Sequence, residues 1–195
     1  MLTVQVALEP NDYAHRNYCA EGAIAVLLSV WTTAVPTLDA IGVAADVNEA
    51  TGTIGANAVA AINGYLHADL GTSAYDYTGV HVTSLTPVIA AIQSDIGAQG
   101  VLVSAGHGTP VLVHVETGTL PGWDGYRAAH MVAIYGYDFT SGNPATETVT
   151  YAESAGSVAG YDGPHTETIS LDALWTAMSA YNADVPSDPV SLIRL

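Results

Sequence analysis

The segment from Cys19 to about Thr33 constrains the fold more than any other part of the chain. It reads C-A-E-G-A-I-A-V-L-L-S-V-W-T-T and is apolar on nearly all sides. A helix without a polar face needs apolar partners all round, so it must lie inside the molecule. The uncharged stretch from Gly22 to Leu38 contains Ser, Thr and Pro and is too short to span a bilayer. The sequence therefore predicts a central buried helix with a cysteine in its first turn, and no membrane insertion.

Other helices are indicated by caps and by apolar spacing. Thr37 can cap a short helix over 38–46, and Ser170 can cap a last helix that reads L-D-A-L-W-T-A-M. A further helix is predicted from near Ser84 to about Ile96. Apolar residues also recur at helical spacing between 51 and 66, at Ile54, Val59, Ile62 and Leu66.

Beyond Gly97 the pattern changes to short apolar runs separated by glycine-rich turns, which are typical of β-strands. The predicted strands cover 101–105, 110–115, 130–137 and 148–152, with a final strand near 190–193. A first strand is predicted over residues 2–8, where Leu2, Val4, Val6 and Leu8 alternate with Thr3, Gln5 and Ala7.

Helices that precede strands within one domain predict an α+β fold, in which N-terminal helices, including the central cysteine-bearing helix, pack on an antiparallel sheet. A chain of 195 residues is expected to form one domain over 1–195. Its helical part is predicted at about 19–96 and its sheet part at about 100–195.

The charge balance excludes several classes of partner. The chain has no lysine and three arginines against nineteen acidic residues, for a net charge of −16. Nucleic acids and anionic lipid surfaces need clustered basic residues, so neither is an expected partner. Low base content favours a secreted or cell-surface bacterial protein. The start M-L-T-V-Q-V-A-L lacks a basic segment, so we expect any signal peptide to be missing from this sequence.

Three residues together indicate nucleophilic chemistry. Cys19 is the single cysteine, which excludes an intramolecular disulfide and a multi-cysteine zinc site. At a helix start, free N–H groups and the helix dipole stabilise a thiolate. His130 opens one predicted strand and Glu153 ends the next, so antiparallel pairing brings them together. A carboxylate there can orient the imidazole while the other ring nitrogen faces the thiol.

The stretches Y-C-A-E-G-A, H-M-V-A-I-Y-G-Y-D and Y-A-E-S occur in that order, and the order resembles papain-like cysteine peptidases. The resemblance is greatest to the compact bacterial branch that includes bacteriocin-leader-processing peptidases. G-T-I-G-A-N-A-V-A-A-I-N-G-Y-L and S-L-D-A-L-W also look like parts of that branch. The resemblance implies a papain-like fold and a hydrolase that cleaves peptide bonds through a thioester. It makes Cys19 the nucleophile, His130 the general base and acid, and Glu153 the group that orients His130, with no cofactor and a peptide or protein as substrate.

The chain departs from the family pattern near these residues. Ala20-Glu21 replaces Gly-Pro, and Glu153-Ser154 replaces Asp-Pro. The family places a glutamine six residues before the cysteine to donate a hydrogen bond to the oxyanion, and this chain has Tyr13 there. The Tyr13 hydroxyl is therefore the candidate oxyanion donor, with Asn11 or Asn17 as alternatives.

Two further interpretations concern other parts of the chain. Trp123, in L-P-G-W-D-G-Y upstream of His130, either lines a substrate cleft or packs within its loop. His107, His114, His130 and Glu116 could in principle hold zinc, but no H-E-x-x-H motif or close helical pair is present. We therefore predict no metal.

Two functions from different classes remain open at this point. One is the secreted cysteine hydrolase, most simply a peptidase, with other acyl transfer on the same fold as a variant. The other is a catalytically impaired papain-like scaffold that acts as a secreted binding or surface module. For the hydrolase, the negative charge of the whole chain predicts a preference for neutral or basic substrates.

Overall fold

The computed structural model describes residues 1–97 and 108–195, and one six-stranded sheet organises this part of the chain. The strand order is β1-β6-β2-β3-β4-β5, and neighbouring strands run antiparallel. The longest strand, β3, lies between β2 and β4 near the middle of the sheet. The strands are β1 Thr78–Val80, β2 Val111–Glu116, β3 Ala129–Asp138, β4 Thr148–Ala152, β5 Thr166–Ser170 and β6 Leu192–Arg194.

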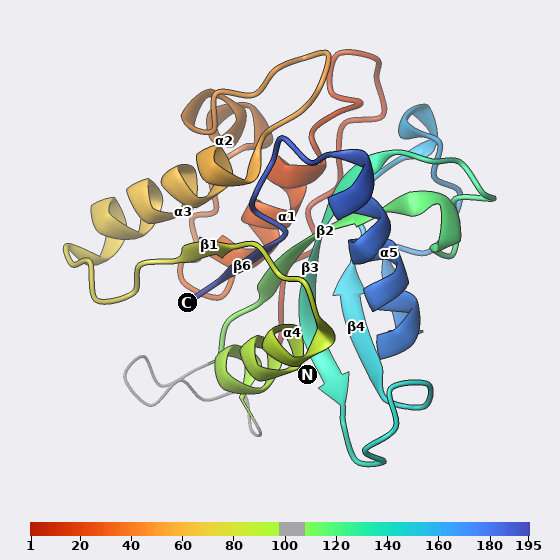
Figure 1. Ribbon diagram of the computed structural model, residues 1–195. Helices are drawn as coiled ribbons and strands as arrows, with labels where there is room; N and C mark the ends of the chain where they lie inside the picture. The colour runs from red at the N-terminus through yellow and green to blue at the C-terminus, as the bar shows by residue number, and fades with distance from the viewer. Residues whose placement is uncertain (98–107) are drawn as a thin grey trace.

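Helices cover both faces of this sheet. They are α1 Cys19–Leu28, α2 Leu38–Ala44, α3 Gly55–Leu70, α4 Leu85–Ala91 and α5 Leu171–Asp184. A π-helical turn, Ile92–Ile96, continues α4, and short 3₁₀ turns lie at Thr117–Thr119 and Ser157–Ala159. Figure 1 shows α2 and α3 on one side of the molecule and α5 on the other. In the part of the chain that is described, no helix is long and apolar enough to cross a membrane.

The strands contribute alternate side chains to two apolar cores. On one face, Leu112 of β2 and Ala133 of β3 pack with α1, α2 and α3. On the other face, Val113 and Val132 pack with α4 and α5. Residues Ala20 to Leu28 of α1 are all buried, because the helix contacts α2, α3 and β3 together. The predicted α+β fold and its central buried helix are therefore confirmed.

Most predicted elements are present close to their expected bounds. Thr37 caps α2 by accepting a hydrogen bond from the Ala40 N–H (3.2 Å), and Ser170 caps α5 through the Ala173 N–H (3.2 Å). The helix from Ser84, the helix that spans Ile62, and the strands at 110–115, 130–137, 148–152 and near 190–193 are also found. The predicted strand at 101–105 lies outside the described residues.

The central helix ends earlier than predicted, at Leu28 instead of about Thr33. The Ser29 hydroxyl donates to the Val26 carbonyl (2.7 Å) and accepts from the Gln5 N–H (3.0 Å). Such side-chain bonds compete with continuation of the helix. The apolar residues after Ser29 therefore pack in a turn.

The predicted first strand is wrong as a sheet element. Residues 2–8 form no strand of the sheet, and the backbone pairs with other backbone groups near the two ends, where the Leu2 N–H donates to the Tyr135 carbonyl and the Glu9 N–H to the Ser154 carbonyl, each at 2.8 Å. The alternating residues still turn one side inward, because Leu2, Val4 and Val6 pack against the core. The short strand β1 and the polar strand β5, T-E-T-I-S, were not predicted, because neither has a long apolar run.

A glycine allows α1 to approach the end of β4. A Cβ added at Gly22 would lie 2.4 Å from the Ser154 Cβ, which is closer than such atoms come in folded proteins. Because Gly22 lies one turn after Cys19 and Ser154 follows Glu153, this contact brings the start of the helix next to the end of the strand.

We expect Gly22→Ala to destabilise the fold by about 1–3 kcal/mol, because the methyl group overpacks this contact. Gly64→Ala is the matched control, since Gly64 is exposed on α3 and nothing lies within 4 Å of its added Cβ. The control should gain up to about 1 kcal/mol from better helix propensity. Denaturant unfolding of both variants measures the difference, and equal stability of the two would contradict the close approach.

Candidate active site

Cys19 is the first residue of α1, where the helix leaves its leading N–H groups without intrahelical partners. The preceding residue, Tyr18, makes no side-chain capping bond, so its side chain does not compete for these groups. The Cys19 side chain is half-buried and lines a cleft. Sequence and local structure thus place the thiol at the positive end of the helix dipole, with access from outside.

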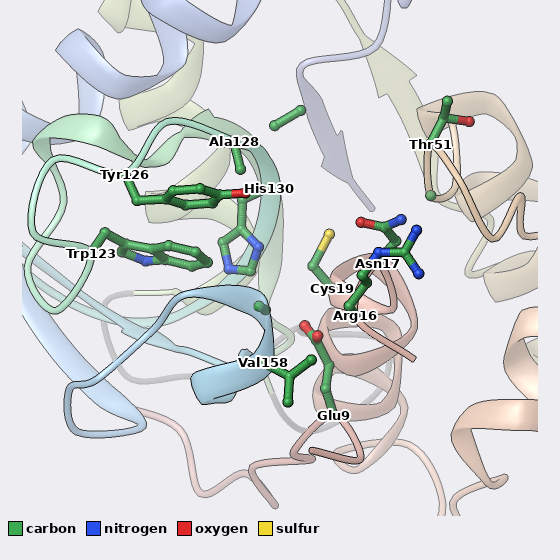
Figure 2. A pocket seen from close by; sticks show the side chains of 13 residues that line it. Glu9, Arg16, Asn17, Cys19, Thr51, Trp123, Tyr126, Ala128, His130 and Val158 are labelled. Atoms are coloured by element: carbon green, nitrogen blue, oxygen red, sulfur yellow. The ribbon is translucent and has the colours of Figure 1, made fainter. Parts of the chain in front are cut away.

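His130 lies near the start of β3, opposite Val115 of β2, and is 3% exposed. Its Nε2 is 2.7 Å from Oε1 of Glu153. Cys19 lines the same cavity and acts on the pKa of the ring, and Figure 2 shows the two side chains next to each other in the cleft. Since Nε2 is occupied by Glu153, Nδ1 is the ring nitrogen left for the thiol.

Glu153 follows the last residue of β4 and is fully buried. Besides His130, its Oε1 accepts the N–H of Ala155 (3.0 Å), and its Oε2 accepts the indole N–H of Trp123 (3.3 Å). A buried carboxylate is tolerated when its oxygens have such donors.

Burial and charge act in opposite directions on this pair. Burial by itself would lower the pKa of His130, but the charge of Glu153 and the hydrogen bonds with Cys19 and Glu153 raise it well above its ordinary 6.5. Burial by itself would raise the pKa of Glu153, but the charge of His130 and the donated hydrogen bonds lower it below its ordinary 4.5. The geometry therefore favours an imidazolium beside a carboxylate.

Trp123 covers the pair from the loop between β2 and β3. Its ring meets the His130 ring edge-on at 5.0 Å between centroids and stacks with Tyr126 at 6.3 Å. The loop turns sharply at this point, with positive φ at Gly122, Asp124 and Gly125. Trp123 is 2% exposed and lines the cleft, so it both supports Glu153 and forms part of the cleft wall (Figure 2).

Cavities lie on both sides of the thiol. One, of about 130 Å³, is lined by Glu9, Arg16, Asn17, Trp123 and Tyr126. The other, of about 340 Å³, is lined by Ile54, His114, Tyr181, Val185 and Asp188. Cys19, Thr51, Gly52, Ala129 and His130 line both. An extended chain bound across Cys19 would therefore find space in two directions.

The structure brings Cys19, His130, Glu153 and Trp123 together, and it does not bring Tyr13 with them. Tyr13 is 73% exposed, its ring lies 3.8 Å from the Arg16 guanidinium carbon, and it is not among the described residues that line the cleft.

The two alternatives to Tyr13 lie in different places. Asn11 is not among the described residues that line the two cavities, and its side-chain oxygen accepts the Val158 N–H (2.9 Å). Asn17 lines the cleft and donates to the Glu49 carbonyl (2.7 Å).

Glu21, in the first turn of α1, is buried. Its Oε1 accepts from the Thr53 hydroxyl (2.5 Å), and its Oε2 has no hydrogen-bond partner among the described residues. Burial raises its pKa, although the Thr53 hydrogen bond acts in the opposite direction. An acid in the first turn favours the helix dipole, and here the packing of α1 against its neighbours also encloses it.

The histidines considered for a metal have other partners. The Nδ1 of His114 is 2.7 Å from the Val190 carbonyl, and its ring stacks on Tyr181 at 4.6 Å. Glu116 accepts a hydrogen bond from Arg127 (2.9 Å). Over residues 1–97 and 108–195 no group of three or more His, Cys, Asp or Glu could hold a metal ion, and His107 lies outside this part.

Two cleft residues were not identified from the sequence as parts of a site. They are Glu9 and Arg16. A signal for Glu9 does exist, because it closes an alternating apolar segment ten residues before the cysteine. Both line the cleft with Cys19.

A cysteine at the start of a buried helix, next to a histidine and an acid on neighbouring strands of an antiparallel sheet, defines a papain-like cysteine peptidase fold. The sequence matches the Peptidase_C39 like family over residues 2–182, and the chain belongs to that family. The predicted resemblance to papain-like cysteine peptidases is thus confirmed, and the bacteriocin-leader-processing branch is consistent with it. A comparison with curated proteins gives no match.

We expect the His130–Glu153 pair to make the free energy of unfolding depend on pH. Because the folded pKa of His130 is raised, its contribution is complete below 6.5 and is lost as pH rises through the folded value. Because the folded pKa of Glu153 is lowered, its contribution is complete above 4.5 and is lost as pH falls through the folded value.

The difference in unfolding free energy between the wild type and Glu153→Gln should therefore be largest between pH 4.5 and 6.5. It should shrink on both sides of that window. Glu49→Gln, which removes an exposed carboxylate, controls for the loss of one negative charge. A difference that stays constant across the pH range would contradict the paired state.

Proposed function

We propose that the chain hydrolyses peptide bonds through a Cys19–His130–Glu153 triad and a thioester intermediate. The observation that carries this proposal is the position of His130, which lines both cavities with Cys19 and is bonded through Nε2 to Glu153. Membership of a cysteine peptidase family supports peptides or proteins as the substrates.

In the first half of the reaction the Cys19 sulfur attacks the carbonyl carbon of the scissile bond. The carbonyl π electrons move onto oxygen, and the tetrahedral intermediate then collapses as the C–N bond breaks. The imidazolium of His130 gives its Nδ1 proton to the departing amine. A thioester on Cys19 and a neutral His130 remain.

In the second half His130 takes a proton from a water molecule that attacks the thioester carbonyl. The C–S bond breaks, the acid product leaves, and the thiolate–imidazolium pair is restored. Glu153 holds Nε2–H throughout, so that Nδ1 keeps facing the thiol. Trp123 covers Glu153 and keeps this hydrogen bond away from water.

The competing function is a binding module in which the scaffold is retained and the chemistry is lost. A fully buried cysteine, with no access from the cleft, would favour that function. Cys19 is half-buried and lines both cavities, and its histidine has an ionised partner. These observations support the hydrolase.

We expect Cys19→Ala to abolish peptide hydrolysis and His130→Ala to reduce kcat/KM by about 10²–10⁴, the range for loss of a general acid–base. Glu153→Gln keeps an oxygen that can accept Nε2–H, whereas Glu153→Ala keeps none, so the alanine variant should lose more activity. Turnover of a fluorogenic peptide library measures each variant.

Labelling with iodoacetamide separates loss of chemistry from loss of fold in these variants. Cys19 should react faster than a model thiol in the wild type and more slowly in His130→Ala. Two results together would refute the proposal. Cys19 of the wild type would react no faster than the model thiol, and the Cys19→Ala variant would hydrolyse peptides as fast as the wild type.

We also propose that neutral or basic peptides are the preferred substrates, because the net charge of −16 repels anionic ones. At low salt, a peptide with flanking lysines should show a higher kcat/KM than its glutamate counterpart. Added salt should reduce the ratio, since screening acts beyond about 10 Å at 0.1 M. Equal turnover of the two peptides at low salt would contradict the preference.

A further inference from the structure

Glu9 is a buried carboxyl in the cleft that the mechanism above does not use. It is 6% exposed and lines the same cavity as Cys19 and His130. Figure 2 shows its carboxyl pointing toward these two side chains. The backbone is fixed there, because the Glu9 N–H donates to the Ser154 carbonyl at the end of β4 (2.8 Å).

The groups around Glu9 favour its neutral form. Burial raises the pKa of Glu9 to about 7, and the carboxylates of Glu153 and Glu21 act in the same direction. The charge of His130 and a hydrogen bond from Ser154 oppose them but are outweighed. Arg16 also lines the cleft, but its guanidinium donates to the Tyr13 carbonyl (2.7 Å).

The hydrogen bond from Ser154 is compatible with a proton on the other carboxyl oxygen. The Ser154 hydroxyl donates to Oε1 of Glu9 at 3.2 Å. A neutral Glu9 protonated on Oε2 keeps Oε1 as the acceptor of this bond. Glu9 then has one hydroxyl donor to offer to a group in the cleft.

We propose that Glu9, as a neutral acid, donates a hydrogen bond to the carbonyl oxygen of the substrate while that oxygen becomes negative. This inference rests on the proposed peptidase function and adds a catalytic residue to it. A fixed donor at a developing oxyanion stabilises the transition state more than the substrate.

The step balances without transfer of the Glu9 proton. As the S–C bond forms, the carbonyl π electrons move onto oxygen, and the Oε2–H of Glu9 shares its hydrogen with that oxygen. When the oxyanion collapses, the C–N bond breaks and the amine takes its proton from His130. An ionised Glu9 would instead repel the oxyanion, so the donor works on the acid side of about pH 7.

The other candidate donors are less well placed. Tyr13 is exposed outside the cleft, and Asn11 bonds to Val158. Asn17 lines the cleft, but its side-chain nitrogen already donates to the Glu49 carbonyl. Asn17 is therefore the alternative that the experiment must separate from Glu9.

The test compares the wild type, Glu9→Gln and Glu9→Ala in two reactions of the same thiol. Hydrolysis of p-nitrophenyl acetate passes through an oxyanion, whereas alkylation by iodoacetamide does not. On the acid side of pH 7, Glu9→Ala should lose about 10²–10³ in hydrolysis, the usual effect of removing one oxyanion donor. Its alkylation rate should stay near that of the wild type, because a neutral group has been removed.

Glu9→Gln separates the donor role from a structural one, since an amide donates at every pH. Its hydrolysis should stay close to the wild-type rate below pH 7 and should continue above it, where the wild type declines as Glu9 ionises. Glu21→Gln is the matched control, because Glu21 is also buried but does not line the cleft in the described structure. It should keep the wild-type rate on the acid side of pH 7, and because the charge of Glu21 is the smallest of the causes that raise the pKa of Glu9, its decline should begin only slightly earlier.

Infrared spectroscopy tests the protonation of Glu9 without catalysis. A carboxylic-acid carbonyl band that fades as pH rises through about 7 should be present in the wild type, and this component should be missing from Glu9→Gln. Equal hydrolysis by Glu9→Ala and the wild type, an ionised Glu9 throughout this range, or selective loss of hydrolysis in Asn17→Ala alone would overturn the assignment. Hydrolysis that persists in Cys19→Ala would instead refute the peptidase function itself.

Discussion

The hydrogen bond between His130 and Glu153 is the interaction on which the rest of the site depends. Both side chains are buried, at 3% and 0% exposure, so each needs the other to remain charged. Glu153 also accepts from Trp123, which fixes the loop after β2 against the end of β4. Gly22 then lets α1 approach this strand end, and Cys19 lines the same cleft as His130.

The shortage of basic residues gives this arrangement a further consequence. Glu9, Glu21 and Glu153 all lie near the start of α1, and His130 is the cation that lowers the pKa of Glu153. Burial raises the pKa of Glu9 to about 7 and also raises the pKa of Glu21. One carboxylate can then face the imidazolium while a second carboxyl nearby serves as a donor. The shortage of basic residues, which excludes nucleic acid partners, thus also affects which carboxyl groups in the site are protonated.

The sequence predicted the elements whose signals are local and missed what depends on distant contacts. The apolar run after Cys19, the Thr37 cap and the strand that His130 opens are each visible in a short window. The end of α1 and the detached course of residues 2–8 depend on Ser29, Gln5 and Tyr135, which lie far apart in sequence. In the same way, His130 and Glu153 could be paired because adjacent strands carry them. Glu9 is held at the cleft by its bonds to Ser154, 145 residues away.

The most direct test of the triad is to capture the acyl group on the enzyme. Mass spectrometry of protein quenched during turnover of p-nitrophenyl acetate should find one acetyl group on Cys19, bound as a thioester that neutral hydroxylamine removes. The same measurement on His130→Ala should find slower acetylation. Continued hydrolysis with Cys19 unmodified, or equally fast acetylation without His130, would contradict the account.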